Sequence, residues 1–231
     1  MKTIAIALFS TLAAVAAELP APLPPTDDVV TKFVEKDNLR RVSVSAYSVT
    51  THYHLENKSR RADMTVRWTR LPNGVKRYQV LSEDGDSGVR SHVFHKLLEA
   101  EAEASRSTEQ QRTWMTPANY AFAVTGKETV NGREAFVVEL TPKTDSKFLT
   151  SGRIWIDAQD YAVIQIEGSP ARNVSFWTKN VTFVQTFQKQ GDFWFVASNH
   201  SLTDARVFGL ADLTIQYSGY EFESRSTKAG E

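Results

Sequence analysis

The sequence predicts a mainly β fold with two to three helices, in which a curved antiparallel sheet forms a half-open β-barrel and the helices cover its concave face. Most of the chain after Val42 alternates apolar and polar residues, as half-buried strands do. Turn signals such as Asn131-Gly132 separate these segments at hairpin spacing. Helical patterns occur near residues 27–41 and 94–106 instead. A sheet of so many antiparallel strands must curve, and the two helical segments are available to cover its inner face.

The first helix is predicted just after a proline-rich stretch. Thr26 or Asp27 is placed to cap it, and the apolar residues that follow have helical spacing, at Val29, Val30, Phe33 and Val34. The helix is expected to end near Arg41, where the period of the pattern changes from helical to alternating.

The remaining elements are predicted as hairpins interrupted by one helix. The turns are expected at Pro72-Asn73-Gly74, Asn131-Gly132, Ala158-Gln159-Asp160 and Gly191-Asp192. The segment 94–106 (FHKLLEAEAEASR) is rich in Ala, Leu, Glu and Lys, which favour helix. The layout is therefore a helix, about three strands, a second helix, and about six or seven further strands.

Composition and charge exclude several classes of protein. The chain has 231 residues, of which 41% are hydrophobic, and its 27 Lys and Arg balance its 27 Asp and Glu. Nucleic-acid binding needs an excess of cations, and disorder needs low hydrophobicity with high net charge, so neither is expected. The absence of cysteine excludes disulfides, thiolate metal sites and cysteine nucleophiles.

The first residues are predicted to be a secretory signal peptide. Lys2 precedes an apolar run from Ile4 to Val15, and small residues follow, with cleavage expected near Ala17. No cysteine follows that point, so the protein is expected to be periplasmic without a lipid anchor. The sequence then divides into a proline-rich tether at 18–26, a single domain at 27–223 and a flexible tail at 224–231.

The aromatic content suggests an apolar groove on the concave face. The chain has 13 Phe, 7 Tyr and 5 Trp, which either fill the core or leave a hollow if the helices act as a lid. The lid residues are expected to be Phe94, Leu97 and Leu98. The candidate groove-lining residues are Met64, Val66, Trp68, Tyr78, Val80, Phe122, Phe136 and Val138.

Catalytic and metal-binding motifs are weak. His52 and His54 lie on the same face of one predicted strand, with His92 farther along, but no carboxylate cluster accompanies them in a recognised pattern. The sequence contains no nucleophile elbow, phosphate-binding loop or dinucleotide fingerprint. We therefore expect no catalytic residue, no metal and no cofactor.

One hairpin carries a family resemblance. Residues 152–164 (GRIWIDAQDYAVI) resemble the recurring strand–turn–strand of the bacterial outer-membrane lipoprotein-carrier (LolA/LolB-like) superfamily. That superfamily also includes RseB-type regulators and mycobacterial lipid-binding lipoproteins. The predicted export, early helix and inserted lid helix fit the same layout. The resemblance implies a half-barrel that shelters acyl chains in its concave face, and it implies no catalytic residues.

Three functions follow as expectations. The leading one is an exported, non-enzymatic carrier of lipid, or of the acyl chain of a lipoprotein, that acts as a monomer with transient contacts to membrane or envelope proteins. The second is a periplasmic sensor or interaction module of the same fold without a lipid client. The third is a metal-dependent hydrolase that uses His52 and His54. A cavity in the concave face would favour the first over the second.

Overall fold

A computed structural model describes residues 22–172, 178–205 and 209–223. The predicted signal peptide, the first residues of the tether and the tail at 224–231 lie outside these ranges. Among the helices within them, none combines the length and the hydropathy of a membrane span.

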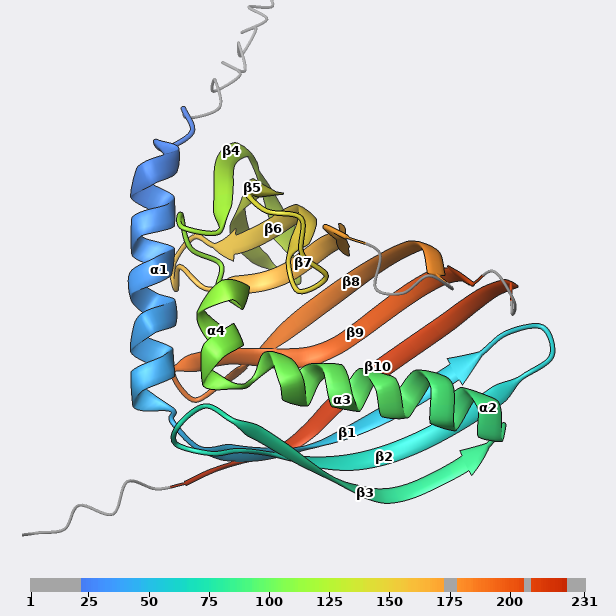
Figure 1. The fold of residues 1–231 in the computed structure, drawn as a ribbon. Coiled ribbons are helices and arrows are strands. Elements are labelled where there is room, and N and C mark those ends of the chain that lie inside the picture. Colours follow the sequence, from blue (N-terminus) through green and yellow to red (C-terminus); the bar gives the residue numbers. More distant parts are fainter. Residues whose placement is uncertain (1–21, 173–177, 206–208, 224–231) are drawn as a thin grey trace, which may run out of the picture.

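A single antiparallel sheet of ten strands dominates the structure, as predicted (Figure 1). Its spatial order is β3-β2-β1-β10-β9-β8-β7-β6-β5-β4, so the last strand, β10, pairs with the first strand, β1. The first group of strands is β1 (Tyr47–Glu56), β2 (Arg61–Arg70) and β3 (Lys76–Gly85). The second group is β4 (Tyr120–Val130), β5 (Arg133–Pro142), β6 (Thr150–Asp157), β7 (Val163–Pro170), β8 (Thr178–Gln190), β9 (Phe193–Ala205) and β10 (Gly209–Phe222).

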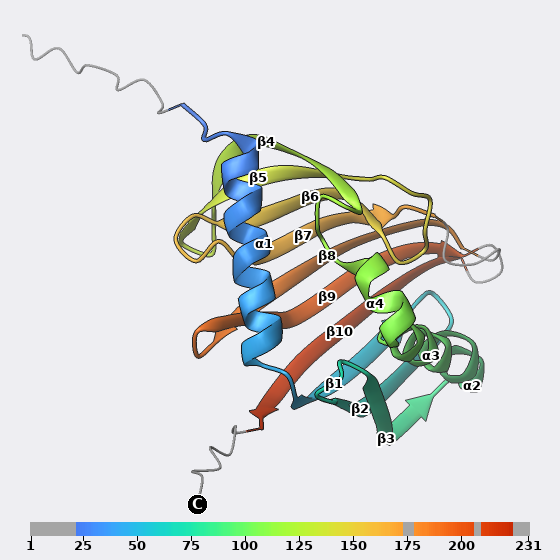
Figure 2. The same ribbon diagram turned by 60° about the vertical axis from the view of Figure 1, so that its left-hand side comes forward.

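The helices lie on one face of this sheet. The long helix α1 spans Thr26–Ser43, and α2 (Ser87–Val89), η1 (Arg90–Phe94) and α3 (His95–Ala104) run on as one irregular rod, followed by α4 (Ser107–Thr113). Figure 2 shows α1 crossing the strands from β4 towards β9, while α3 lies over β1, β2 and β3. Contacts agree with this path, since Thr26 Oγ1 accepts a hydrogen bond from Val124 N of β4, and Arg40 lies over the ring of Phe195 of β9.

Two helix boundaries differ from those predicted. Pro25 precedes α1 as its cap residue, and Thr26 bonds to the β4 backbone instead of capping the helix. The second helix begins at Ser87 rather than near residue 94, because the carboxylate of Asp86 accepts a hydrogen bond from Val89 N at 2.8 Å and starts the helical rod there.

Turns and close strand contacts shape the sheet. Asn131 and Gly132 have φ of 50° and 77°, which the predicted Asn-Gly hairpin turn requires. Gly152 of β6 pairs with Gly168 of β7, and a Cβ at Gly152 would lie 2.1 Å from Glu167 O. This glycine pair lets the two strands approach where a side chain would clash. Register shifts in five strand pairs of the described sheet add twist.

The core consists of two clusters on the concave face and a smaller third cluster. The cluster beneath α3, which we call the α3 cluster, includes Tyr53, Met64, Trp68 and Phe94. The cluster beneath the first half of α1, the α1 cluster, includes Val29, Phe33, Phe136 and Ile154. The third contains Ala135, Val137, Trp155 and Ile164. Its members on β5 and β6 alternate with residues of the α1 cluster and so point to the opposite face.

Candidate functional site

A partly open cavity of about 1120 Å³ separates the two concave-face clusters. Its walls come from the second half of α1, the end of α3, α4, and the middle strands β8, β9 and β10. Ligand sites in proteins commonly have volumes of about 300–1,000 Å³, so this space is large enough for a sizeable molecule. The concave face is therefore packed at both ends and hollow between them.

The helix α1 changes its chemistry where it reaches the cavity. Val29 and Phe33 are buried in the α1 cluster. One turn further, the same stripe of the helix carries Asp37, Arg40 and Arg41, because residues three and four positions apart share a face. All three charged residues line the cavity. The stripe of α1 that packs onto the sheet in its first turns is therefore polar where it faces the cavity.

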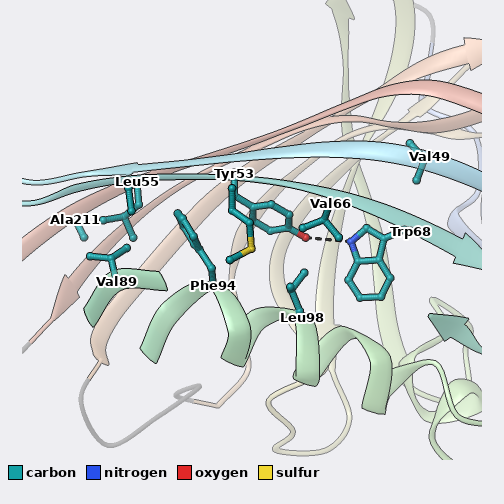
Figure 3. Packing of buried hydrophobic residues seen from close by; sticks show 11 residues of the cluster. Val49, Tyr53, Leu55, Val66, Trp68, Val89, Phe94, Leu98 and Ala211 are labelled. Atoms are coloured by element: carbon teal, nitrogen blue, oxygen red, sulfur yellow. Dashed lines mark hydrogen bonds between the residues drawn. The ribbon is translucent and has the colours of Figure 1, made fainter. Parts of the chain in front are cut away.

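The helix α3 makes the same change from the other side. Phe94 and Leu98 are fully buried on β1 and β2, as Figure 3 shows, whereas Glu101 and Ser105 farther along the stripe line the cavity. Glu101 lies 2.7 Å from Lys76 Nζ, and Ser105 Oγ accepts a hydrogen bond from Lys76 N at 2.8 Å. Burial by itself would lower the pKa of Lys76, but the attraction of Glu101 raises it, so the pair stays ionised.

Aromatic side chains form one wall of the cavity. Phe195 of β9 packs against Tyr47 and Tyr220, with ring centroids 5.5 and 5.2 Å apart. The hydroxyl of Tyr220 donates to Val196 O at 2.8 Å, so its polar atom is satisfied by the sheet. Phe187 and Phe193 line the same space. This wall therefore offers a ligand an apolar surface, because the hydroxyl of Tyr220 is already hydrogen-bonded.

The turn between β6 and β7 closes the cavity at another side. Asp160, which lines it, accepts hydrogen bonds from Arg133 Nη2 at 3.1 Å, Lys189 Nζ at 2.8 Å and Trp194 Nε1 at 2.8 Å. Burial would raise the pKa of Asp160, but the hydrogen bonds from Lys189 and Trp194 lower it below its usual value. Its charge is therefore already balanced by protein groups.

The predicted groove residues lie in the packed clusters beside the cavity. Met64, Val66 and Trp68 are at most 2% exposed beneath α3, and Trp68 Nε1 donates to the hydroxyl of Tyr53 at 3.2 Å (Figure 3). Val80 packs against this cluster, and the ring of Tyr78 lies 5.2 Å from that of Trp68. Phe122, Phe136 and Val138 belong to the α1 cluster.

None of these eight residues is among the described residues that line the cavity. The predicted lid residues Phe94 and Leu98 are buried in the α3 cluster, and Leu97, on the same helix, is half-buried. The structure thus brings the eight together in two groups rather than one, and their role as ligand contacts stays a prediction.

His52 and His54 lie on the outer, convex face of the sheet, because they alternate along β1 with Tyr53 and Leu55 of the α3 cluster. His54 Nδ1 lies 2.8 Å and His52 Nε2 lies 3.3 Å from Asp63 Oδ1. His92 lies on η1, where its Nδ1 is 2.9 Å from Ser91 Oγ. Within residues 22–172, 178–205 and 209–223, no group of His, Asp and Glu has the arrangement that a metal ion needs.

Comparisons with known proteins return solved structures only. No family model and no curated protein matches the chain. A DUF1329 family protein from Desulfovibrio piger aligns over 90% of this chain and 97% of its own, with 12% identity and a TM-score of 0.48. A LolA superfamily protein from Nitrosomonas europaea aligns over 89% and 97%, with 10% identity and a TM-score of 0.45.

A third match is described as an outer membrane lipoprotein-sorting protein domain from Vibrio parahaemolyticus. It covers 86% of this chain and 95% of that one, with 16% identity and a TM-score of 0.42. The match from Nitrosomonas europaea carries the name of the superfamily that the hairpin at residues 152–164 resembles.

Sequence reasoning missed the charged part of the site. Asp37, Arg40 and Arg41 continue the helical spacing of Val29 and Phe33, so the change from apolar to charged residues along one stripe was a readable signal. Arg70 and Tyr47 had no such signal, because they reach the cavity through the pairing of β1 with β2.

Proposed function

We propose that the protein is an exported, non-enzymatic binder and carrier of lipid, or of the acyl chain of a lipoprotein, in the central cavity. The observation that carries this proposal is a space of about 1120 Å³ between two clusters that are packed independently of it. A fold that needed this space only for stability would fill it, because protein interiors are close-packed. A retained hollow with an aromatic wall is typical of a ligand site.

The energetics of an acyl chain support binding in the micromolar range. Each methylene removed from water contributes about 0.8 kcal/mol, so a chain of about fourteen carbons contributes about 11 kcal/mol before losses. Ordering the chain and the surrounding side chains reduces this sum. A micromolar dissociation constant corresponds to about 8 kcal/mol, which leaves room for those losses.

The test is a titration with a dansyl-labelled fatty acid, whose fluorescence rises in apolar surroundings. Wild-type protein is expected to bind the probe with a micromolar dissociation constant. The variant Ala104→Trp places an indole in the cavity from the end of α3, because Ala104 lines it, and should weaken binding at least about tenfold. Ala121→Trp, on the exposed side of β4, is the matched control and should bind like wild type.

Two outcomes would overturn the proposal. The first is the absence of probe binding by a folded wild-type protein, which would favour the interaction module without a lipid client. The second is equal binding by wild type and Ala104→Trp, which would place the probe elsewhere on the molecule.

A further inference from the structure

Three arginines meet at one end of the cavity with a single carboxylate among them. Arg40 and Arg41 come from the last turns of α1, Arg70 comes from the end of β2, and all three line the cavity. Asp37 Oδ1 lies 2.8 Å from Arg40 Nη2, and Asp37 Oδ2 lies 2.5 Å from Arg41 Nη2. The hydrogen bonds of Arg70 Nη1 go to the backbone carbonyls of Val44 and Ser45. The cluster therefore carries three positive charges against one negative side chain.

The surrounding groups do not remove this excess. The nearby Lys76 and Glu101 are paired with each other, so together they contribute no net charge. Lys36, one turn before Arg40, adds a further cation to the cavity lining. The carbonyl groups at the end of α1 carry only the partial negative charge of a helix terminus, about half an elementary charge. With Asp160 and Asp192 included, the cavity lining holds five Lys and Arg against four Asp and Glu, so the sum remains positive.

Arg41 keeps part of its hydrogen-bonding capacity unused. Its Nε is shielded from solvent and has no hydrogen-bond partner among the described residues. Its guanidinium lies 4.3 Å above the ring of Trp114, which fixes the plane of the fork. A buried donor without a partner is costly, so such groups in native proteins call for an explanation, and a missing ligand is one.

The electrostatics agree with this arrangement. Burial lowers the pKa of Arg41, Asp37 partly restores it, and the repulsion of Arg40 and Arg70 lowers it further. Burial also lowers the pKa of Arg70, with Arg40 acting in the same direction after the opposing effect of Tyr47. The three guanidinium groups therefore repel one another in a shielded site, and an anion placed between them would relieve that repulsion.

We propose that Arg40, Arg41 and Arg70 bind the anionic group, a phosphate or a carboxylate, of an amphiphile whose apolar chain lies against the aromatic wall of the cavity. This inference rests on the proposed function and names the chemistry of its ligand. Guanidinium groups bind phosphate and carboxylate oxygens through paired, charge-assisted hydrogen bonds, and such bonds are stronger in shielded surroundings. Phe195 connects the two parts of the site, since it lies 5.8 Å from the guanidinium carbon of Arg40 and packs against Tyr220.

The test compares two ligands with the same chain, dodecyl phosphate and uncharged dodecanol, as competitors of the uncharged fluorescent probe N-phenylnaphthylamine. Wild type should bind dodecyl phosphate about tenfold more tightly than dodecanol, since one hydrogen bond to a charged group is worth about that factor. Arg41→Gln and Arg40→Gln should each abolish most of this preference, because they weaken dodecyl phosphate binding much more than dodecanol binding.

Two further variants complete the test: one is expected to change the affinity in the opposite direction, and the other is a control. Asp37→Asn removes the carboxylate that competes with the ligand, so it should tighten dodecyl phosphate binding several-fold, the opposite sign from the arginine variants. Arg61→Gln, on the exposed outer side of β2 with its guanidinium paired to Asp63, is the control and should behave like wild type. Thermal unfolding of each variant establishes that it is folded.

A separate titration with inorganic phosphate distinguishes the source of the anion. If inorganic phosphate binds as tightly as dodecyl phosphate, the site binds a free anion, and the proposal of an amphiphilic ligand is wrong. If wild type binds both dodecyl ligands equally, or if the arginine variants weaken both equally, the anion site is wrong while the proposed function stands. If neither dodecyl ligand displaces the probe, the proposed function fails as well.

Discussion

Beneath α3 the concave face of the sheet is filled, whereas between α3 and α1 the same face is hollow. At the filled end, Phe94 and Leu98 insert among Tyr53, Met64 and Trp68, all at most 2% exposed. At the hollow, the strands present Phe187, Phe195 and Tyr220, yet the helices above them offer Glu101, Asp37, Arg40 and Arg41.

The difference shows that the helices decide where the half-barrel is filled. Strands at both places turn apolar side chains inward, so the pattern of the strands alone does not separate the packed region from the hollow one. Along the stripe that faces the sheet, each helix begins with apolar residues, such as Val29 and Phe33 of α1, and continues with charged residues, such as Asp37 of α1 and Glu101 of α3. Charged side chains do not pack into an apolar interior without partners, which leaves the middle of the sheet uncovered.

The largest expected effect concerns the filled end. Phe94→Ala should reduce the free energy of unfolding by about 3–5 kcal/mol, because it leaves a cavity among fully buried side chains. Leu39→Ala, at a cavity-lining side chain that is 51% exposed, is the matched control and should change it by less than about 0.5 kcal/mol. Urea denaturation measures the free energy of unfolding of wild type and of both variants. Equal losses would mean that the two regions do not differ in packing.

A smaller effect is expected at the turn that joins the α1 cluster to the cavity. Asp157 is 1% exposed, and its carboxylate accepts hydrogen bonds from Arg133, Asp160 N and Gln159 N. Asp157→Asn should lower the free energy of unfolding by about 2 kcal/mol at pH 7, since it weakens charge-assisted hydrogen bonds to a buried group.

The same residue gives a pH dependence. Burial would raise the pKa of Asp157, but the hydrogen bond from Arg133 and those from the turn backbone lower it. Its stabilising contribution is therefore present above the pKa of the unfolded chain, near 3.8, and is lost as the pH falls through the lower folded value. Denaturation midpoints between pH 5 and about 2 should fall less steeply in Asp157→Asn than in wild type, and parallel curves would contradict this assignment.

The smallest effect tests the polar contact inside the filled end. Tyr53→Phe removes the acceptor of Trp68 Nε1 and should cost about 1 kcal/mol at neutral pH. Burial, followed by the charge of Glu101, raises the pKa of Tyr53 to about 12. A tyrosine with a raised pKa stabilises the fold fully below the unfolded value of 10.0, and that contribution is lost as the pH rises towards 12.

Denaturation between pH 9 and about 12 should therefore show a shallower decline in Tyr53→Phe than in wild type. The decline should not vanish, because burial also raises the pKa of Tyr217 and acts in the same direction. An unchanged slope would show that Tyr53 does not titrate in a shielded site.

The fold could be predicted from the sequence because its signals are local. Alternation marks the strands, and Asn131-Gly132 requires the positive φ values that the structure has. The double burial of β5 was missed, since Val137 and Val138 are both buried on opposite faces and only one face was expected to be apolar. The outer face of this strand is covered by Trp155, which comes from β6 and so depends on sheet packing.

The kind of site could be predicted from the sequence, whereas the choice of its lining residues stays a prediction. An apolar hollow under the helices was expected from the aromatic content and the small number of helices, but the residues chosen for it, such as Met64 and Val138, are packed beneath them. Inward-facing strand residues are alike in sequence whether a helix covers them or not. Which of them remain uncovered depends on the length and path of α1 and α3, which a residue pattern does not encode.

Native mass spectrometry of the protein purified from its own host without detergent tests directly whether the central cavity holds a lipid. We expect wild-type species whose added mass corresponds to a lipid, with that addition lost or strongly reduced in Ala104→Trp and retained in Ala121→Trp. Wild-type protein of bare polypeptide mass, together with no displacement of a fluorescent fatty acid, would contradict it.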